Sequence, residues 1–257
     1  MALHDKIAHT MEFPPETEQP NVYPLSWHNK TKKLEEIWDA AQRENWDAKK
    51  LPWDTFDVEK YTWEEREAIA YWWTILSVFD ASAPPVFAEA MIKTYEVHEE
   101  DAVRRCFFSV TRDEQNHEQM CGMAITKLLG SPSPLEHEPK SELGKLAQRN
   151  ARWLYYNGGR YWNGYKKAVP KYSLAVLFSS FLMGEIAAAT IFHQMAAGCK
   201  EPVFKEAFRN IGRDEGRHMA ICLSVMERDY PKLPKEDAAV ITKQVRAGYL
   251  FLSAVLF

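Results

Sequence analysis

Two segments of the same composition constrain this chain more than any other feature. They are residues 112–121, with the sequence RDEQNHEQMC, and residues 213–222, with the sequence RDEGRHMAIC, so the second begins 101 positions after the first. Arg, Asp, Glu, His and Cys occupy the same places in both, and each contains Glu-x-x-His. Residues three apart on a helix share a face, so each segment sets a carboxylate beside an imidazole.

Most of the chain has the apolar spacing of helices, and no β-rich alternating run stands out, which predicts an all-α fold. The expected helices cover residues 31–50, 67–79, 87–95, 100–129, 141–156, 174–197, 202–229 and 235–257. Thr62 with Glu65 predicts a capping box at the start of the helix that contains residues 67–79. Pro84-Pro85 predicts that this helix is kinked or interrupted before residue 87. Residues 157–159 predict a further break, and residues 160–172 fit no element clearly.

The whole chain is expected to form one domain. Residues 1–30 would be an extended arm, and about residues 62–230 would form a bundle. The net charge of −4 gives no basic footprint for nucleic acid. Residues 1–21 show no secretory leader, and the apolar residues 249–257 are too few to span a bilayer, so no membrane partner is expected. Four cysteines in a chain of this length indicate a reducing, cytoplasmic setting.

Glu185 is the carboxylate that the apolar pattern explains least. No other charge lies between Leu177 and Ala189, and burying an unpaired charge is costly. A turn near Lys200 lies 15 residues after Glu185 and 15 before Glu215. Antiparallel helices joined by a tight turn bring such residues to the same height, so Glu185 is expected beside Glu215.

The same rule gives a partner for Glu114. The turn near His98 lies 16 residues before Glu114, which places the partner near position 82. Asp80 is two residues from that position, and Glu89 is seven residues away, or about 10 Å along a helix axis. Asp80 is therefore preferred, and Glu89 remains the alternative.

The expected ligand set contains four carboxylates and two imidazoles. Its members are Asp80, Glu114, His117, Glu185, Glu215 and His218. Four carboxylates neutralise two divalent cations, which allows the group to lie in a core. Such ligands suit iron and manganese, whereas zinc favours fewer oxygens and calcium avoids imidazole. This pattern is typical of a dinuclear centre inside a four-helix bundle.

Four further residues are expected to lie around these ligands. Asp113 and Asp214 either accept the free N–H of a ligating imidazole or pair with the arginine that precedes each of them. Cys121 and Cys222 follow their histidines by four residues and should face the site. Each is either a thiol that takes part in the chemistry or a small core residue.

These residues, with the segment LPWDTFDV at 51–58, resemble the ferritin-like di-metal carboxylate superfamily. Within it they are similar to the small subunit of class I ribonucleotide reductase and to the ligand-binding oxidases. The resemblance covers roughly residues 53–230 and places Trp53 near the electron-transfer tryptophan of that group. It implies a ferritin-like four-helix bundle core with flanking helices. It also implies two iron ions, or manganese with iron, O₂ as co-substrate, and a homodimer formed through the arm and outer helices.

The departures from that family narrow the function. Cys121 stands at the place of the reductase's radical tyrosine, so no tyrosyl radical is expected there. The chain shows no docking tail after Phe257, which argues against a reductase role. Ser180 replaces the crosslinking tyrosine of the ligand-binding oxidases, and Ile211 replaces a third histidine of the arylamine N-oxygenases. Bacterial multicomponent monooxygenase hydroxylases, in contrast, have cysteine at the Cys121 position.

We therefore expect an oxidase or oxygenase that activates O₂ and oxidises a small apolar organic substrate, with an external electron donor. Residues 187–190 either leave room for that substrate or allow close helix packing. Three alternatives remain: a ribonucleotide reductase small subunit-like radical protein, a ferritin- or rubrerythrin-like protein that handles iron or peroxide, and a helical partner subunit with a vestigial site. The absence of Cys-x-x-Cys in the sequence argues against rubrerythrin.

Overall fold

The computed structural model describes residues 29–256, and within them every regular element is a helix. The long helices are α2 (Lys32–Arg43), α3 (Trp63–Glu96), α4 (Asp101–Leu129), α5 (Glu142–Ala168), α6 (Leu174–Gly198), α7 (Pro202–Asp229) and α8 (Lys235–Leu256). Short 3₁₀ helices are η1 (Ala48–Lys50), η2 (Trp53–Thr55), η3 (Val58–Lys60) and η4 (Tyr230–Lys232). The all-α prediction is confirmed. Of the arm predicted at residues 1–30, all but the last two residues lie outside the described part, as does Phe257.

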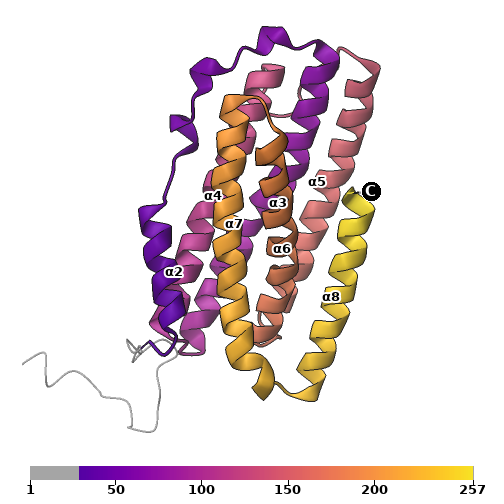
Figure 1. Ribbon diagram of the computed structural model, residues 1–257. Helices are drawn as coiled ribbons and strands as arrows, with labels where there is room; N and C mark the ends of the chain where they lie inside the picture. Colours follow the sequence, from indigo (N-terminus) through magenta and orange to yellow (C-terminus); the bar gives the residue numbers. More distant parts are fainter. Residues whose placement is uncertain (1–28, 257) are drawn as a thin grey trace, which may run out of the picture.

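Two antiparallel pairs, α3 with α4 and α6 with α7, form the middle of a helical bundle (Figure 1). Helix α2 lies along α4 and α7, α5 packs on α3, and α8 packs on α6. Two apolar clusters fill the bundle. One contains Trp73 stacked on Phe208 at 5.1 Å, and the other contains Phe107 beside Phe178 at 4.8 Å between ring centres. The residues of the two Glu-x-x-His segments lie between these clusters along the helices.

Helix α3 runs from Trp63 to Glu96 with Pro84 and Pro85 inside it, so the predicted interruption is wrong. A proline removes one helical hydrogen bond and crowds the preceding turn. Here Phe87 and its neighbours remain buried in the bundle, and packing along the whole of α4 outweighs that penalty. Because the helix is continuous, nine residues or about two and a half turns separate Asp80 from Glu89, which places the two on opposite faces.

Helix α5 continues through Gly158 and Gly159, so the predicted break at residues 157–159 is also wrong. A Cβ atom at position 158 would lie 2.9 Å from Cγ1 of Val78 on α3. The glycine therefore lets the two helices approach closely rather than ending one of them. Of the unassigned residues 160–172, those up to Ala168 belong to α5.

The first helix is shorter than predicted, because α2 ends at Arg43 and only Ala48–Lys50 form a further 3₁₀ turn. The side chain of Asn116 on α4 holds the intervening segment. It accepts from the backbone N–H of Ala48 and donates to the backbone oxygen of Trp46, each at 3.1 Å. These contacts between distant parts of the chain outweigh the local helical pattern over residues 44–50.

Several local predictions are confirmed. Thr62 and Glu65 form the capping box at the start of α3. Gly130 follows α4 in the left-handed conformation with φ 70°, which suits glycine. Helix α7 has the predicted bounds, Pro202–Asp229. The α3–α4 turn places His98 at φ 53°.

Helices α3 and α6 are long and apolar enough, by length and composition alone, to cross a membrane. The core helix of a soluble protein satisfies the same criterion. Each of the two also carries a buried carboxylate, Asp80 on α3 and Glu185 on α6. This property therefore assigns no location to the chain.

Candidate metal centre

The two Glu-x-x-His segments face each other across the bundle. The ring centres of His117 on α4 and His218 on α7 are 6.2 Å apart, and both rings are buried. The three-residue spacing brings Glu114 and Glu215 to the same faces as their histidines. Both predicted carboxylate–imidazole pairs therefore meet in one place.

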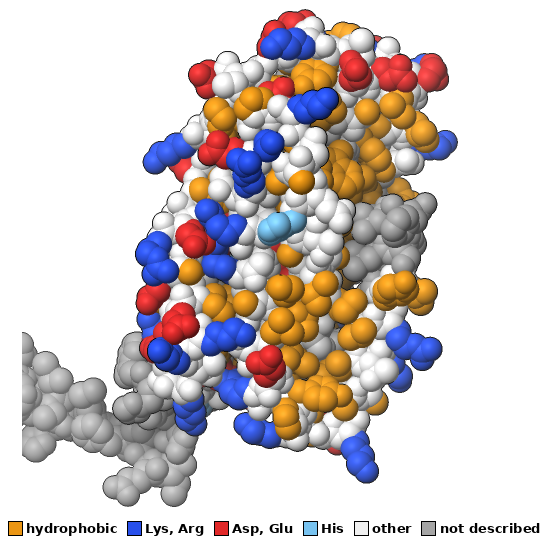
Figure 2. Space-filling view, viewed as in Figure 1, with side chains coloured by type: hydrophobic (Ala, Val, Ile, Leu, Met, Phe, Trp, Pro, Cys, Tyr) orange, Lys and Arg blue, Asp and Glu red, His pale blue; other side chains and the backbone are white. Residues whose placement is uncertain are grey.

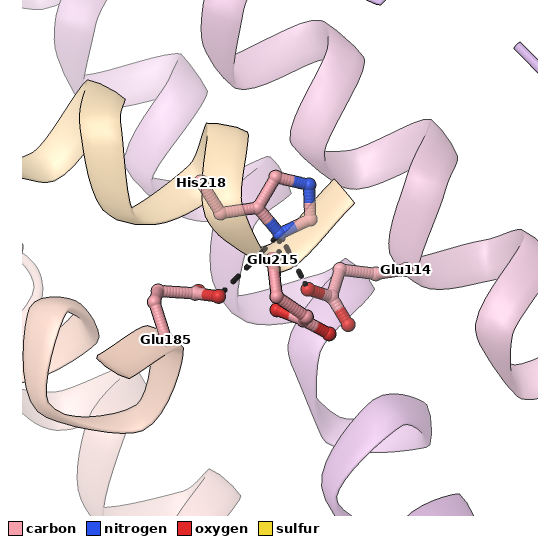
Figure 3. A group of neighbouring side chains, drawn as sticks. All are labelled: Glu114, Glu185, Glu215 and His218. Carbon is pink, nitrogen blue, oxygen red and sulfur yellow. Dashed lines mark ion pairs between the residues drawn. The ribbon is translucent and has the colours of Figure 1, made fainter. Parts of the chain in front are cut away.

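Three carboxylates, one each from α4, α6 and α7, converge on His218 (Figure 3). Its Nδ1 lies 3.2 Å from Oε1 of Glu114, 3.4 Å from Oε2 of Glu185 and 3.4 Å from Oε2 of Glu215. One donor atom from each of the four residues lies within 4.8 Å of the others, and all four residues are buried. This arrangement could hold a metal ion, and it brings Glu185 and Glu215 together at the predicted height.

His117, the other histidine, faces the second oxygen of Glu114 and of Glu215. Nδ1 of His117 lies 3.4 Å from Oε1 of Glu215 and 3.8 Å from Oε2 of Glu114. Glu114 and Glu215 thus each turn one oxygen toward each histidine. Two adjacent cation positions that share a pair of carboxylates would have this geometry.

Asp80 joins the cluster from α3 and is buried. Burial, together with the nearby charge of Glu114, raises the pKa of Asp80 well above its usual value, while His117 opposes the shift. The thiol of Cys121 lies 3.5 Å from Oδ2 of Asp80. The structure therefore places Asp80, and not Glu89 on the opposite face, beside the two segments.

The outward nitrogens of both histidines face carboxylates. Nε2 of His117 lies 3.1 Å from Oδ2 of Asp214, and Nε2 of His218 lies 3.5 Å from Oδ2 of Asp113. In the described part of the chain, both inward Nδ1 atoms are buried without a hydrogen-bond partner, and so is Nε2 of His218, for which Asp113 at 3.5 Å is only an ion-pair neighbour. A buried, unpartnered nitrogen that points into a group of carboxylates is the donor that a metal ion requires.

Arg217 connects the two outward carboxylates. It donates to Asp214 and, at 3.4 Å, to Asp113, and its other terminal nitrogen lies 2.6 Å from Oε2 of Glu44. Arg112 also bonds Asp113, at 2.7 Å. Asp113 therefore contacts both a histidine and the arginine that precedes it. Asp214 contacts His117 and Arg217, and the preceding arginine, Arg213, lies farther away, with its Nε 3.8 Å from Oδ1 of Asp214. Both aspartates are buried, so the solvent-facing form of the pairing is wrong.

Burial raises the pKa of Asp113, but His218 and Arg112 outweigh that effect and hold its pKa at about 2. Asp113 therefore stays ionised beside the outward nitrogen of His218. Arg217, which shares this carboxylate, was not identified from the sequence, because it aligns with Asn116 in the other segment and breaks the symmetry between the two.

Trp46 is a second residue that the sequence did not identify. Its Nε1 donates to Oδ2 of Asp214 at 2.7 Å, and its half-buried ring stacks on His117 with 6.2 Å between ring centres. Trp53, the tryptophan favoured by the resemblance, instead donates to the backbone oxygen of Ala48. The sequence predicts Trp46 inside a helix over residues 31–50. Because α2 ends at Arg43, the side chain of Trp46 instead points toward α4 and α7.

Charges within the cluster are strongly interdependent. Burial and the charge of Glu215 raise the pKa of Glu185, as burial and Glu114 do for Asp80. Burial lowers the pKa of both histidines, yet the surrounding carboxylates raise it well above the usual value. Burial likewise raises the pKa of Glu215, but the nearby imidazoles of His117 and His218, each 3.4 Å away, bring that pKa well below normal. The surrounding carboxylates thus stabilise positive charge at the centre of the group, which is what a cation site requires.

Both predicted cysteines lie at the site and are buried. Burial raises the pKa of Cys121, and Asp80 raises it further; burial and Glu185 do the same for Cys222. Both remain protonated thiols at neutral pH. Cys121 contacts Asp80, whereas Cys222 belongs to the apolar cluster around Phe178.

No protein-family model matches this chain, and no curated protein matches it. Its side chains are therefore the guide to its function.

Proposed function

We propose that the chain is a ferritin-like four-helix bundle with flanking helices that holds two iron ions, or manganese with iron. In this proposal it uses O₂ to oxidise a small apolar organic substrate. One observation carries the proposal: Glu114 and Glu215 each turn one oxygen toward His117 and the other toward His218. A single cation would leave one histidine without a partner, whereas two adjacent cations use every inward donor atom.

The remaining ligands complete each position. Asp80 and His117 would hold one cation, and Glu185 and His218 the other, with Glu114 and Glu215 shared. Four carboxylates balance two divalent ions, so a neutral group can lie between the two apolar clusters. Carboxylate and imidazole donors favour iron and manganese over zinc or calcium.

Reduced iron or manganese in such a site supplies the capacity to bind O₂ and pass its oxidising power to a substrate. The protein's own residues keep the ligands in place. Asp214 bonds Nε2 of His117 and Asp113 lies 3.5 Å from Nε2 of His218, so each would orient the inward Nδ1 of a ligating histidine. The apolar clusters at both ends exclude water, which favours oxidation of an apolar substrate over side reactions.

Electrons for repeated turnover would come from an external donor through Trp46. The indole is half-buried, donates to Asp214 and stacks on His117. Trp46 therefore connects the protein surface to the proposed metal ligand His117, both directly and through Asp214. This connection supports an enzyme that is reduced repeatedly more than a vestigial site. A cytoplasmic homodimer remains our expectation.

The experiment that tests this function follows O₂ after anaerobic loading with Fe(II). We expect O₂ uptake with a new near-ultraviolet absorbance from oxidised, bridged iron, and a fixed small ratio of iron to chain. The variant Glu185→Gln should lose the response, while Glu89→Gln, on the opposite face of α3, should keep it. Uptake of many irons per chain would instead indicate storage, and no O₂-dependent change would contradict the proposal.

A further inference from the structure

The outward face of α5 presents aromatic and basic side chains along a single stripe. Its members, which we call the α5 stripe, are Leu146, Arg149, Trp153, Tyr156, Arg160 and Lys167. Their spacing of three, four and seven residues places them on one face of the helix. All six are exposed, with Trp153 at 59% and Tyr156 at 67%, because α5 packs on α3 through its other face.

The charge of this helix opposes that of the chain. Helix α5 has six basic residues and one acidic residue, although the net charge of the protein is −4. Glu142, the acidic residue, already pairs with Lys145 at 2.6 Å. Within residues 29–256, none of the three cations of the stripe has a carboxylate within ion-pair distance, and Arg160 lies over the ring of Tyr156 at 5.9 Å. The stripe is therefore an uncompensated positive surface.

The shape of the stripe fits a flat partner. From Leu146 to Lys167 a helix extends about 32 Å at 1.5 Å per residue, and the cations are distributed along that whole length. A continuous helix presents them in one line with tryptophan and tyrosine between them. Tryptophan, tyrosine and long basic side chains are the residues that settle at the boundary between lipid headgroups and acyl chains.

We propose that the α5 stripe docks the protein on an anionic phospholipid surface. Arg149, Arg160 and Lys167 would meet the phosphates, while Leu146, Trp153 and Tyr156 would reach the upper acyl region. This contact is peripheral and needs no membrane-spanning segment. It replaces the expectation from the sequence that the protein has no membrane partner. The inference is independent of the metal centre and holds for the protein with or without metal.

An acidic protein is the other partner that this charge would suit. The apolar members favour the membrane, because Leu146, Trp153 and Tyr156 along one exposed helix face find an apolar layer at a constant depth in a bilayer. A compact acidic protein would contact only part of the length of the α5 stripe. The experiment below separates the two.

The test is cosedimentation of the full chain with vesicles of phosphatidylcholine alone and of phosphatidylcholine mixed with phosphatidylglycerol. We expect binding to the mixed vesicles that weakens as salt is added, since salt screens exposed charges. Each cation at an anionic surface contributes about five-fold in affinity, so Arg149→Gln with Arg160→Gln should weaken binding about 25-fold. Trp153→Ala with Tyr156→Ala should weaken binding to the same vesicles at every salt concentration.

The matched control is Lys49→Gln with Lys50→Gln, which removes the same charge from η1 beside α4 and should leave binding unchanged. Unchanged helical circular dichroism and metal content would show that each variant folds. Failure to bind the mixed vesicles, or binding that the control reduces as much as the stripe variant, would overturn the proposal. So would a dimer in solution that the stripe variants dissociate, since the stripe would then be a contact between two copies.

Discussion

Trp46 and His117 share one oxygen atom. Oδ2 of Asp214 lies 2.7 Å from Nε1 of Trp46 and 3.1 Å from Nε2 of His117. A carboxylate in this position couples a surface segment after α2 to a proposed metal ligand on α4. The coupling gives the first prediction.

Replacing Trp46 by phenylalanine keeps an aromatic ring but removes the N–H that Asp214 accepts. We expect the oxidised centre to be reduced about ten-fold more slowly or worse, by analogy with other residues that orient metal ligands. Stopped-flow absorbance with a chemical reductant measures this rate. Trp53→Phe is the control, because its indole bonds only the backbone of Ala48. Equal rates in the two variants would count against the route through Trp46.

Arg217 neutralises two buried carboxylates at once. The variant Arg217→Met leaves Asp113 and Asp214 without that cation, and breaking a buried ion pair costs about 3 kcal/mol. Because those carboxylates orient the histidines, metal affinity should also fall about 10- to 100-fold. Calorimetric unfolding and metal titration measure the two effects. The exposed Arg209 on the same helix supplies the control, Arg209→Met, which should change neither quantity.

Metal binding should release protons. The carboxylates that surround His117 and His218 raise the pKa of both rings, so each ring holds a proton at neutral pH before a metal binds. A ligating imidazole must be neutral, and therefore affinity should rise as the pH rises toward that raised pKa and should weaken as the pH falls. Titration calorimetry in two buffers of different ionisation enthalpy counts the protons released. A heat that is independent of the buffer would refute this account of the charges.

Two neighbouring glycines in α5 should respond in opposite ways. Gly158→Ala sets a Cβ atom 2.9 Å from Val78, so we expect destabilisation of about 1–3 kcal/mol from overpacking. Nothing lies within 4 Å of a Cβ atom at Gly159, and Gly159→Ala should stabilise the helix by up to about 1 kcal/mol. Denaturant unfolding compares the two. Similar losses of stability in both would mean that α5 does not pack on α3 as described.

The ligand residues could be predicted from the sequence because two regular features determine them. Three-residue spacing fixes Glu114 with His117 and Glu215 with His218, and equal distances from a turn bring Glu185 to the height of Glu215. For Asp80 the sequence leaves Glu89 as an alternative, because Pro84-Pro85 obscures the register of α3. The structure brings the two Glu-x-x-His pairs and Glu185 together and places Asp80 beside them, in contact with Cys121, while their binding of metal remains a prediction.

The residues that sequence reasoning missed depend on contacts between distant segments. In the sequence Gly158 suggests a helix break, but in the structure it allows the close approach of Val78 on α3. Trp46 follows the pattern of the first helix, but Asn116 bonds its backbone oxygen outside that helix. Arg217 suggests a surface cation, but it donates to the buried Asp113 of α4. Local propensity contains none of this information, because each contact joins residues at least 70 positions apart.

The metal content of the protein tests the central claim most directly. The chain is loaded anaerobically with Fe(II), with and without Mn(II), freed of unbound metal and analysed by elemental mass spectrometry. The account predicts about two metal ions per chain, as in other carboxylate-bridged bundles, and their loss in a Glu114→Ala, Glu215→Ala variant. Fewer than roughly half an ion per chain, with the helical fold intact, would contradict it.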